Sequence, residues 1–306
     1  MNQAMKAILP VWKTTPITIL HRESGIPPVD QLLDARRLRF SARLKSRDEA
    51  HPLANRTRPP RQPTYHDLIK RRYQIQTESR FRTRLQRTHE LLASCTRPKL
   101  VQRCFHQEQM PPLQAASKDK SADAFSRWVE SLDPLTLVVY SDGSLSSEGA
   151  ASYGLTIHQN NVPILDGSGR LGLAEVFDAE ATGALEGLKA ALNQRDSATQ
   201  KIHICLDNLA AAACLRGTPS DSSQDVFLEF QALAAWHGAT QVRWMPGHTD
   251  IPGNEQADKL AKVASSLPEP EGAQPTLAYL RRIARQQPKE AFEAWWPTSL
   301  LSSTRD

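Results

Sequence analysis

The chain has 306 residues, a formal net charge of +5 and four cysteines. This length is typical of two domains, with a full hydrophobic core in at least one of them. The cysteines are too few for a disulfide framework and lack the paired C-x-x-C spacing of a zinc site. No apolar run reaches membrane-spanning length, and the N-terminal stretch does not resemble a signal peptide. We therefore expect an intracellular protein of the nucleus or cytoplasm, with no membrane partner.

Positive charge is concentrated in the first third of the chain. Residues 1–110 carry 22 Lys and Arg against 9 Asp and Glu, whereas residues 111–306 carry 16 against 24. Such a split is typical of a basic segment that binds polyanions, joined to a domain with a different role. The alternative is that these arginines only solvate exposed helices.

The basic segment, residues 1–106, is expected to be helical. Helix candidates cover residues 15–28, 29–46 and 71–94, and on the second of them the arginines spread round the side opposite the apolar residues. Residues 107–133 begin with a polar, proline-containing stretch and are expected to be a linker between domains.

From residue 134 the pattern changes to that of a mixed sheet. Three strands bounded by turn residues come first, and segments of helical and strand period then alternate. The order over residues 134–266 is β-β-β-α-β-α-α-β-α, which predicts an α/β fold with one five-stranded mixed sheet and helices on its faces. Residues 267–306 are expected to form a helical tail, divided into two helices at Pro288.

The first of these strands ends in an unusual way, in the sequence "LTLVVYSDGSLSS". Leu137 to Tyr140 lack polar alternation, which is typical of a strand buried on both faces. Asp142 is expected where this strand leaves the sheet, and Gly143 allows the backbone to turn there. Taken alone, Asp142 could be a turn residue, a helix cap or one corner of a charged site.

Three further acids occupy comparable positions. Glu180 is expected in the first turn of the helix that opens "DAEATGALEGL", where the helix dipole alone would explain an acid. Asp207 ends the strand "KIHICLD" and could equally cap the helix that follows. Asp258 lies inside the last helix beside Ala257, where aspartate has a poor helix propensity, so a purely local explanation fits it badly.

These acids would meet at one edge of the predicted sheet. Asp142 and Asp207 share that edge if the first and fourth strands are neighbours, and Glu180 lies near the start of the intervening helix. Four carboxylates gathered there would repel one another, and two divalent cations would offset their charge. All-oxygen ligands favour Mg²⁺, with Mn²⁺ as the alternative, over zinc. Two such ions about 4 Å apart can clamp an in-line displacement at phosphorus.

The motifs "YSDGS", "DAEA", "CLDN" and "WMPGHTDIPGNEQADKLA" resemble, in this order, those of type 1 ribonuclease H. The resemblance implies a metal-dependent endonuclease that cuts the RNA strand of an RNA–DNA hybrid and leaves 5′-phosphate and 3′-hydroxyl ends. It implies that Asp142, Glu180, Asp207 and Asp258 hold two Mg²⁺ ions. It also implies that His248, on a loop, assists proton transfer or product release.

The same resemblance assigns three further positions. Ser144, Asn208 and Asn254 match positions that face the substrate, although Ser144 and Asn208 could simply serve as caps. The chain departs from the family pattern at Asp250, where many members carry glycine. This extra acid near His248 is expected to alter either the motion of the loop or the affinity for metal.

The segments on either side resemble those that flank ribonuclease H in fungal non-LTR retrotransposon polyproteins, and residues 1–105 look like the stretch after the polymerase palm. A reverse transcriptase polymerase domain is therefore a candidate partner beside the RNA–DNA hybrid. The chain has no Y-x-D-D motif and is not expected to polymerise, and Met1 is compatible with a start inside a longer element. The rival hypothesis is a decaying, non-catalytic fragment that only binds nucleic acid; the four intact acids argue against it.

Overall fold

The computed structural model describes residues 2–58, 82–101 and 118–302. The chain divides into two compact units, which are described separately. The first comprises Met1–Ser94 together with Leu280–Asp306, and the second comprises Cys95–Tyr279.

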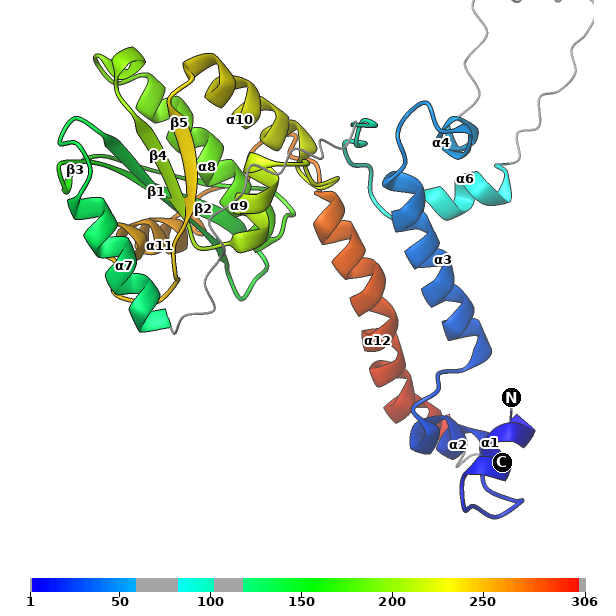
Figure 1. Ribbon diagram of the computed structural model, residues 1–306. Helices are drawn as coiled ribbons and strands as arrows, with labels where there is room; N and C mark the ends of the chain where they lie inside the picture. Colours follow the sequence, from blue (N-terminus) through cyan, green and yellow to red (C-terminus); the bar gives the residue numbers. More distant parts are fainter. Residues whose placement is uncertain (1, 59–81, 102–117, 303–306) are drawn as a thin grey trace, which may run out of the picture. The chain divides into compact units, whose positions relative to one another are not determined.

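The second unit is built on one five-stranded sheet with strand order β3-β2-β1-β4-β5 (Figure 1). The pairs β1–β2 and β2–β3 are antiparallel, whereas β1–β4 and β4–β5 are parallel. This confirms the predicted mixed sheet and its element order. The elements are α7 (Lys118–Glu130), β1 (Leu137–Leu145), β2 (Ala151–Gln159), β3 (Val162–Arg170), α8 (Val176–Leu192), the 3-10 turn Ser197–Thr199, β4 (Ile202–Leu206), α9 (Leu209–Arg216), α10 (Gln224–His237), β5 (Thr240–Trp244) and α11 (Pro252–Ala264).

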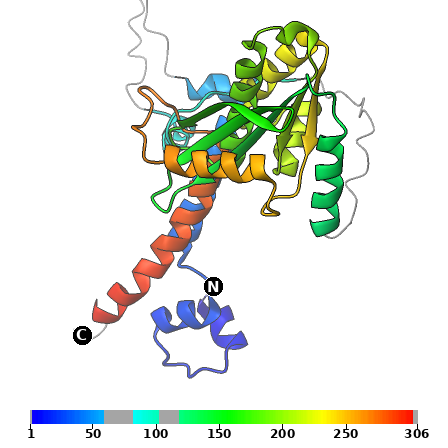
Figure 2. The ribbon, with the colours of Figure 1, turned by 90° about the vertical axis from the view of Figure 1, so that its left-hand side faces the viewer.

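The central strands β1 and β4 are buried on both faces, which accounts for their apolar runs, whereas the edge strand β3 is largely exposed. On one face, α8, α9 and α10 pack on Val139, Ile157 and Ile204, which are fully buried. On the other face, Val138 and Tyr140 pack with residues of α7 and α11 (Figures 1 and 2). Because consecutive residues of β1 point to opposite faces, this strand contributes to both cores.

Two predictions outside the sheet are wrong: the linker over residues 107–133 and the division of the C-terminal tail into two helices. The stretch expected to be a linker, residues 107–133, contains α7, whose Phe125 is buried against the sheet. The C-terminal tail is one continuous helix, α12 (Leu277–Ser302), and Pro288 lies within it. Proline removes one backbone donor, but the residues around Pro288 are mostly Ala, Arg, Gln, Lys and Glu, which favour helix strongly enough to continue it.

The first unit is helical in its described part, as predicted for the basic segment. Its long helix α3 packs on α6. Ser41 Oγ of α3 donates a hydrogen bond to the carbonyl oxygen of His89, the last residue of α6, at 3.2 Å. The expected helix over 71–94 lies partly outside the described residues, and α6 is its described portion. The elements are α1 (Asn2–Ile8), α2 (Ile17–Ser24), α3 (Val29–Lys45), α4 (Pro52–Thr57) and α6 (Arg84–His89). Among the described helices, none is both long and apolar enough to cross a membrane.

Glycine at position 154 sets the distance between β2 and α11. A Cβ atom there would lie 2.1 Å from the Ala257 carbonyl oxygen and 2.4 Å from the Ala261 nitrogen. Both atoms belong to the helix backbone, which cannot yield as a side chain can. The absence of a side chain therefore lets α11, the helix that carries Asp258, lie directly on the sheet.

We expect Gly154→Ala to lower the free energy of unfolding by about 3 kcal/mol, because α11 must move away from β2. Gly167→Ala is the matched control, since its Cβ would lie 3.2 Å from the movable Leu155 Cδ1. The control should change stability by less than about 1 kcal/mol. Urea unfolding of both variants measures the difference, and equal effects would contradict the close packing of α11.

Candidate metal centre

Asp142 lies where the parallel pairing of β1 with β4 ends. The registered pairs run from Leu137–Ile202 to Tyr140–Cys205, and two residues further along each strand stand Asp142 and Asp207. The strand itself does not end there as predicted, because β1 continues to Leu145 and Asp142 still pairs with Gly154 of β2. The Asp142 side chain is 7% exposed, and its Oδ1 accepts a hydrogen bond from the Gly143 nitrogen at 2.7 Å.

Asp207 directly follows β4 and lies against the end of β5 and the residues after it. The Trp244 indole nitrogen donates a hydrogen bond to the Asp207 carbonyl oxygen at 2.8 Å. Gly247 passes so close that a Cβ atom there would lie 2.0 Å from Asp207 Oδ2. Any side chain at Gly247 would collide with the Asp207 carboxylate, which explains the glycine in "PGHTD".

Glu180 reaches the same edge from α8. It is the fifth residue of that helix and lies in its second turn, rather than in the first turn as predicted. The approach of β1 to α8 depends on Gly143, where a Cβ would lie 2.9 Å from the Glu180 nitrogen and 2.9 Å from the Val176 carbonyl oxygen. Glu180 is 2% exposed, and its Oε2 has no hydrogen-bond partner among the described residues.

The three side chains form one acidic cluster. One carboxylate oxygen from each of Asp142, Glu180 and Asp207 lies within 4.8 Å of the others. Burial, and then the charge of Asp207, raises the pKa of Asp142 to about 6. Burial, and then the charge of Asp142, raises the pKa of Glu180 well above its ordinary value. These groups are costly to ionise without a cation, and their oxygen atoms are the donors that hard divalent ions prefer, so the cluster can hold a metal.

Asp258 approaches this cluster without joining it. It lies on α11 with its side chain 16% exposed, and its Oδ2 accepts a hydrogen bond from Lys262 Nζ at 2.6 Å, one turn further along the helix. Its negative charge contributes to the raised pKa of Asp142. The structure thus brings three of the four expected carboxylates together and places the fourth within electrostatic reach, paired with a lysine.

His248 and Asp250 lie on the loop between β5 and α11. Both side chains are exposed, and their φ angles of 55° and 56° fall in the left-handed region. Glycine adopts this region without strain, which gives a physical reason for its frequency in the family at the position of Asp250. The loop is bridged by Thr249, whose hydroxyl donates to the Pro246 carbonyl oxygen at 2.9 Å.

The three residues expected at the substrate have different surroundings. Ser144 is half-buried near the end of β1. Asn208 caps α9, since its Oδ1 accepts a hydrogen bond from the Ala211 nitrogen at 3.1 Å, as the alternative interpretation had it. Asn254 is 2% exposed, and its Oδ1 has no partner among the described residues.

Asp178 is a buried acid that the sequence reasoning missed. Its Oδ1 accepts hydrogen bonds from the hydroxyls of Ser222 and Ser223, each at 2.7 Å. Its Oδ2 accepts from the Thr276 hydroxyl at 2.7 Å and from the Glu175 nitrogen at 3.0 Å. With both oxygens occupied by protein donors, Asp178 anchors the start of α8 rather than offering a ligand. Its position three residues after Glu175, in the capping box of α8, is the sequence feature that could have indicated its structural role.

Comparison with known proteins supports the interpretation of this part of the chain. Residues 134–266 match the family model described as RNase H, so this region is an RNase H domain. No curated protein sequence matches the chain.

Similar solved structures include RNase H1 from the archaeon Halobacterium salinarum, with 22% identity, a TM-score of 0.36, and coverage of 42% of this chain and 96% of that one. The N-terminal RNase H domain of a Mycobacterium tuberculosis protein shows 19% identity, a TM-score of 0.37, and coverage of 43% and 96%. The protease–reverse transcriptase of prototype foamy virus shows 18% identity, a TM-score of 0.39, and coverage of 45% and 22%.

We expect Asp142→Asn to stabilise the metal-free protein at pH 7.5 and to have little effect near pH 4. The pKa of Asp142 is raised from 3.8 to about 6, so the folded state binds the proton more tightly than the unfolded state. The stability associated with the neutral carboxyl is therefore present at low pH and lost as the pH rises through about 6. The gain at pH 7.5 should be on the order of 2 kcal/mol.

Urea unfolding in EDTA at the two pH values measures this gain. Asp123→Asn removes the same charge from an exposed position on α7 and serves as the control. A gain of equal size at both pH values would contradict the role of burial in raising the pKa of Asp142.

Proposed function

We propose that the chain is a Mg²⁺-dependent endoribonuclease that cuts the RNA strand of RNA–DNA hybrids and leaves 5′-phosphate and 3′-hydroxyl ends. The observation that carries this proposal is the convergence of Asp142, Glu180 and Asp207 at one sheet edge. That edge lies within residues 134–266, the region that matches the RNase H family model.

The residues present fit two hard cations. Asp142, Glu180 and Asp207 would hold one site, and Asp142 with Asp258 would complete the other. The unpartnered Oε2 of Glu180 supports this assignment, because a buried carboxylate oxygen without a donor is costly unless a cation is near. When bound, two Mg²⁺ ions, or Mn²⁺ as the alternative, supply Lewis acidity at the scissile phosphate.

The remaining roles fall to the chain's own side chains. Gly143 leaves room for α8 and Glu180 beside β1, and Gly247 leaves room for the Asp207 carboxylate. We assign to His248, exposed on its loop, the transfer of a proton or the release of product. We assign to Ser144, Asn208 and Asn254 the hydrogen bonds that orient the hybrid.

We propose the following division of the chain, with support from sequence patterns. Residues 134–266 are the nuclease, residues 107–133 lead into it, and residues 267–306 are a helical tail. The basic segment 1–106 and the tail resemble retrotransposon flanks, so a reverse transcriptase polymerase domain is the proposed protein partner.

A cleavage assay on the full chain tests the proposed activity. End-labelled RNA is presented in an RNA–DNA hybrid, in an RNA duplex and as a single strand, with Mg²⁺ or with EDTA. We expect cutting of the hybrid alone, in Mg²⁺ alone, and a loss of several orders of magnitude in Asp142→Asn and Asp207→Asn. Asp123→Asn should cleave as the wild type does. Binding of hybrid with no Mg²⁺-dependent cleavage would favour the rival hypothesis of a non-catalytic fragment.

A second prediction separates His248 from the metal ligands. His248→Asn should lower the turnover number about tenfold or more while leaving Mg²⁺ affinity nearly unchanged, because the imidazole is not a proposed ligand. Asparagine is chosen since it tolerates the left-handed backbone at this position better than alanine. Calorimetric titration of Mg²⁺ without substrate, together with the cleavage rate at saturating Mg²⁺, tests the assignment. Lost Mg²⁺ binding would show that His248 helps to hold the metal.

A further inference from the structure

One side of α3 carries a row of arginines that are not paired with other residues of the described chain. Arg36, Arg39 and Arg43 are spaced by three and four residues, which places them on one face of the helix. All three side chains are exposed, and none forms a hydrogen bond or an ion pair with a described residue. At 1.5 Å per residue the row is about 10 Å long.

A groove runs beside this row, between α3 and α6. Its volume is about 780 Å³, and its lining includes the apolar side chains of Leu33, Phe40 and Leu85. Phe40 is 41% exposed and Leu33 is 55% exposed, although both belong to a packed helix pair. The charged residues of the lining are Arg36, Arg37 and Arg84 together with Asp30 and Asp34. Asp34 is paired with Arg37 at 2.9 Å, so one positive charge is left in excess beside the apolar surface. Arg36 belongs to both the lining and the arginine row, and the row continues past the groove with Arg39 and Arg43.

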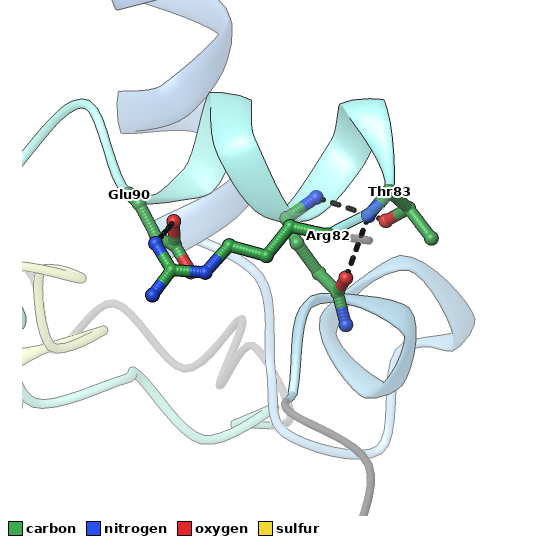
Figure 3. A network of polar contacts seen from close by, with 4 residues as sticks. Arg82, Thr83 and Glu90 are labelled. Atoms are coloured by element: carbon green, nitrogen blue, oxygen red, sulfur yellow. Dashed lines mark hydrogen bonds and ion pairs between the residues drawn. The ribbon is translucent and has the colours of Figure 1, made fainter. Parts of the chain in front are cut away.

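The α6 wall of this groove is fixed at both ends. At its start, Thr83 and Gln86 form a reciprocal capping box, in which each side chain accepts a hydrogen bond from the other residue's backbone nitrogen (Figure 3). Arg82 and Glu90 form an ion pair at 2.7 Å that joins the residues before and after the helix (Figure 3). The capping box stabilises the start of this short helix, whereas the exposed ion pair contributes little.

The positive charge of the arginine row favours a negatively charged occupant. The neighbouring segment of this chain, residues 59–81, has five Lys and Arg against two Asp and Glu, so its charge does not complement an arginine row. A nucleic-acid strand supplies a regular series of negative charges, and over about 10 Å it presents more than one phosphate. The exposed ring of Phe40 and its aliphatic neighbours fit the faces of bases, which are accessible in a single strand and stacked away in a duplex.

We propose that the α3–α6 groove is a second nucleic-acid site, which binds single-stranded RNA or DNA. Arg36, Arg39 and Arg43 contact the phosphates, and Phe40 stacks on a base. The site lies in the unit that does not contain the acidic cluster. It needs no metal, so it can be tested separately from the proposed cleavage.

Fluorescence anisotropy of the full chain in EDTA measures this binding, with labelled 12-mers of dT and U and a 12-bp hybrid over a KCl series. The triple variant Arg36→Gln, Arg39→Gln, Arg43→Gln should raise the Kd for the single strands at least tenfold at low salt. Because each phosphate contact contributes a slope of about −0.7 for a single strand, its salt dependence should become shallower by about 2. The triple replacement by lysine should retain the slope.

A matched variant controls for overall charge. Arg56→Gln, Arg127→Gln, Arg195→Gln removes three charges from exposed positions on α4, on α7 and in the turn after α8. It should change the Kd by less than twofold. An equal loss in both glutamine variants would show only nonspecific attraction and would overturn the proposal.

Phe40→Leu tests the stacking contact, since it keeps an apolar side chain and removes the ring. It should raise the Kd for single strands about fivefold or more and leave the salt slope unchanged. If Phe40→Leu has no effect and the hybrid duplex binds as tightly as the single strands, the single-strand assignment is wrong. If the α3 variants lower the unfolding temperature and leave every Kd unchanged, the chain itself fills the groove, and the proposal is overturned.

Discussion

The mutual repulsion of buried carboxylates is the constraint on which the second unit depends. Asp142 and Glu180 are almost inaccessible, and burial raises the pKa of both. The charge of Asp207 further raises the pKa of Asp142, and the charge of Asp142 further raises the pKa of Glu180. Nothing in such a cluster favours folding by itself, so the surrounding core must hold it together. The central strand β1 supplies that rigidity, because it cannot shift without disturbing a hydrophobic core on each face of the sheet.

Glycines carry much of this arrangement. Gly143 brings β1 against α8, Gly154 brings β2 against α11, and Gly247 leaves room for the Asp207 carboxylate. At each of these positions a methyl group would meet a backbone atom or a carboxylate at less than 3.0 Å. The acidic cluster is therefore positioned as much by missing side chains as by the acids.

The sheet could be predicted because its signals are local. The change from strand period to helix period gives the element order, and the neighbouring first and fourth strands bring Asp142 and Asp207 together. The end of β1 could not be predicted in the same way, because its last residues pair with β2 although they lack the apolar pattern of a buried strand. Similarly, α7 is defined by the packing of Phe125, a contact made across the fold rather than along the chain.

The sequence predicts which acids lie at the site, but it does not predict how their side chains are paired. Residue type and position indicate Asp142, Glu180 and Asp207, but the ion pair of Asp258 with Lys262 depends on side-chain conformation. Positive φ at His248 and Asp250 likewise follows from the path of the loop. Asp178 was missed because its partners come from segments distant in the sequence.

Those distant partners also determine which residues the second unit needs. Three of the four hydrogen bonds to Asp178 come from the hydroxyls of Ser222, Ser223 and Thr276, and Thr276 lies ten residues beyond the region that matches the family model. A protein shortened to residue 266 would keep every recognisable motif and still lose one donor to a fully buried carboxylate. A missing partner of this kind costs about 1–3 kcal/mol. The compact unit that holds Asp178 and its partners, Cys95–Tyr279, is thus longer than the region that carries the recognisable motifs.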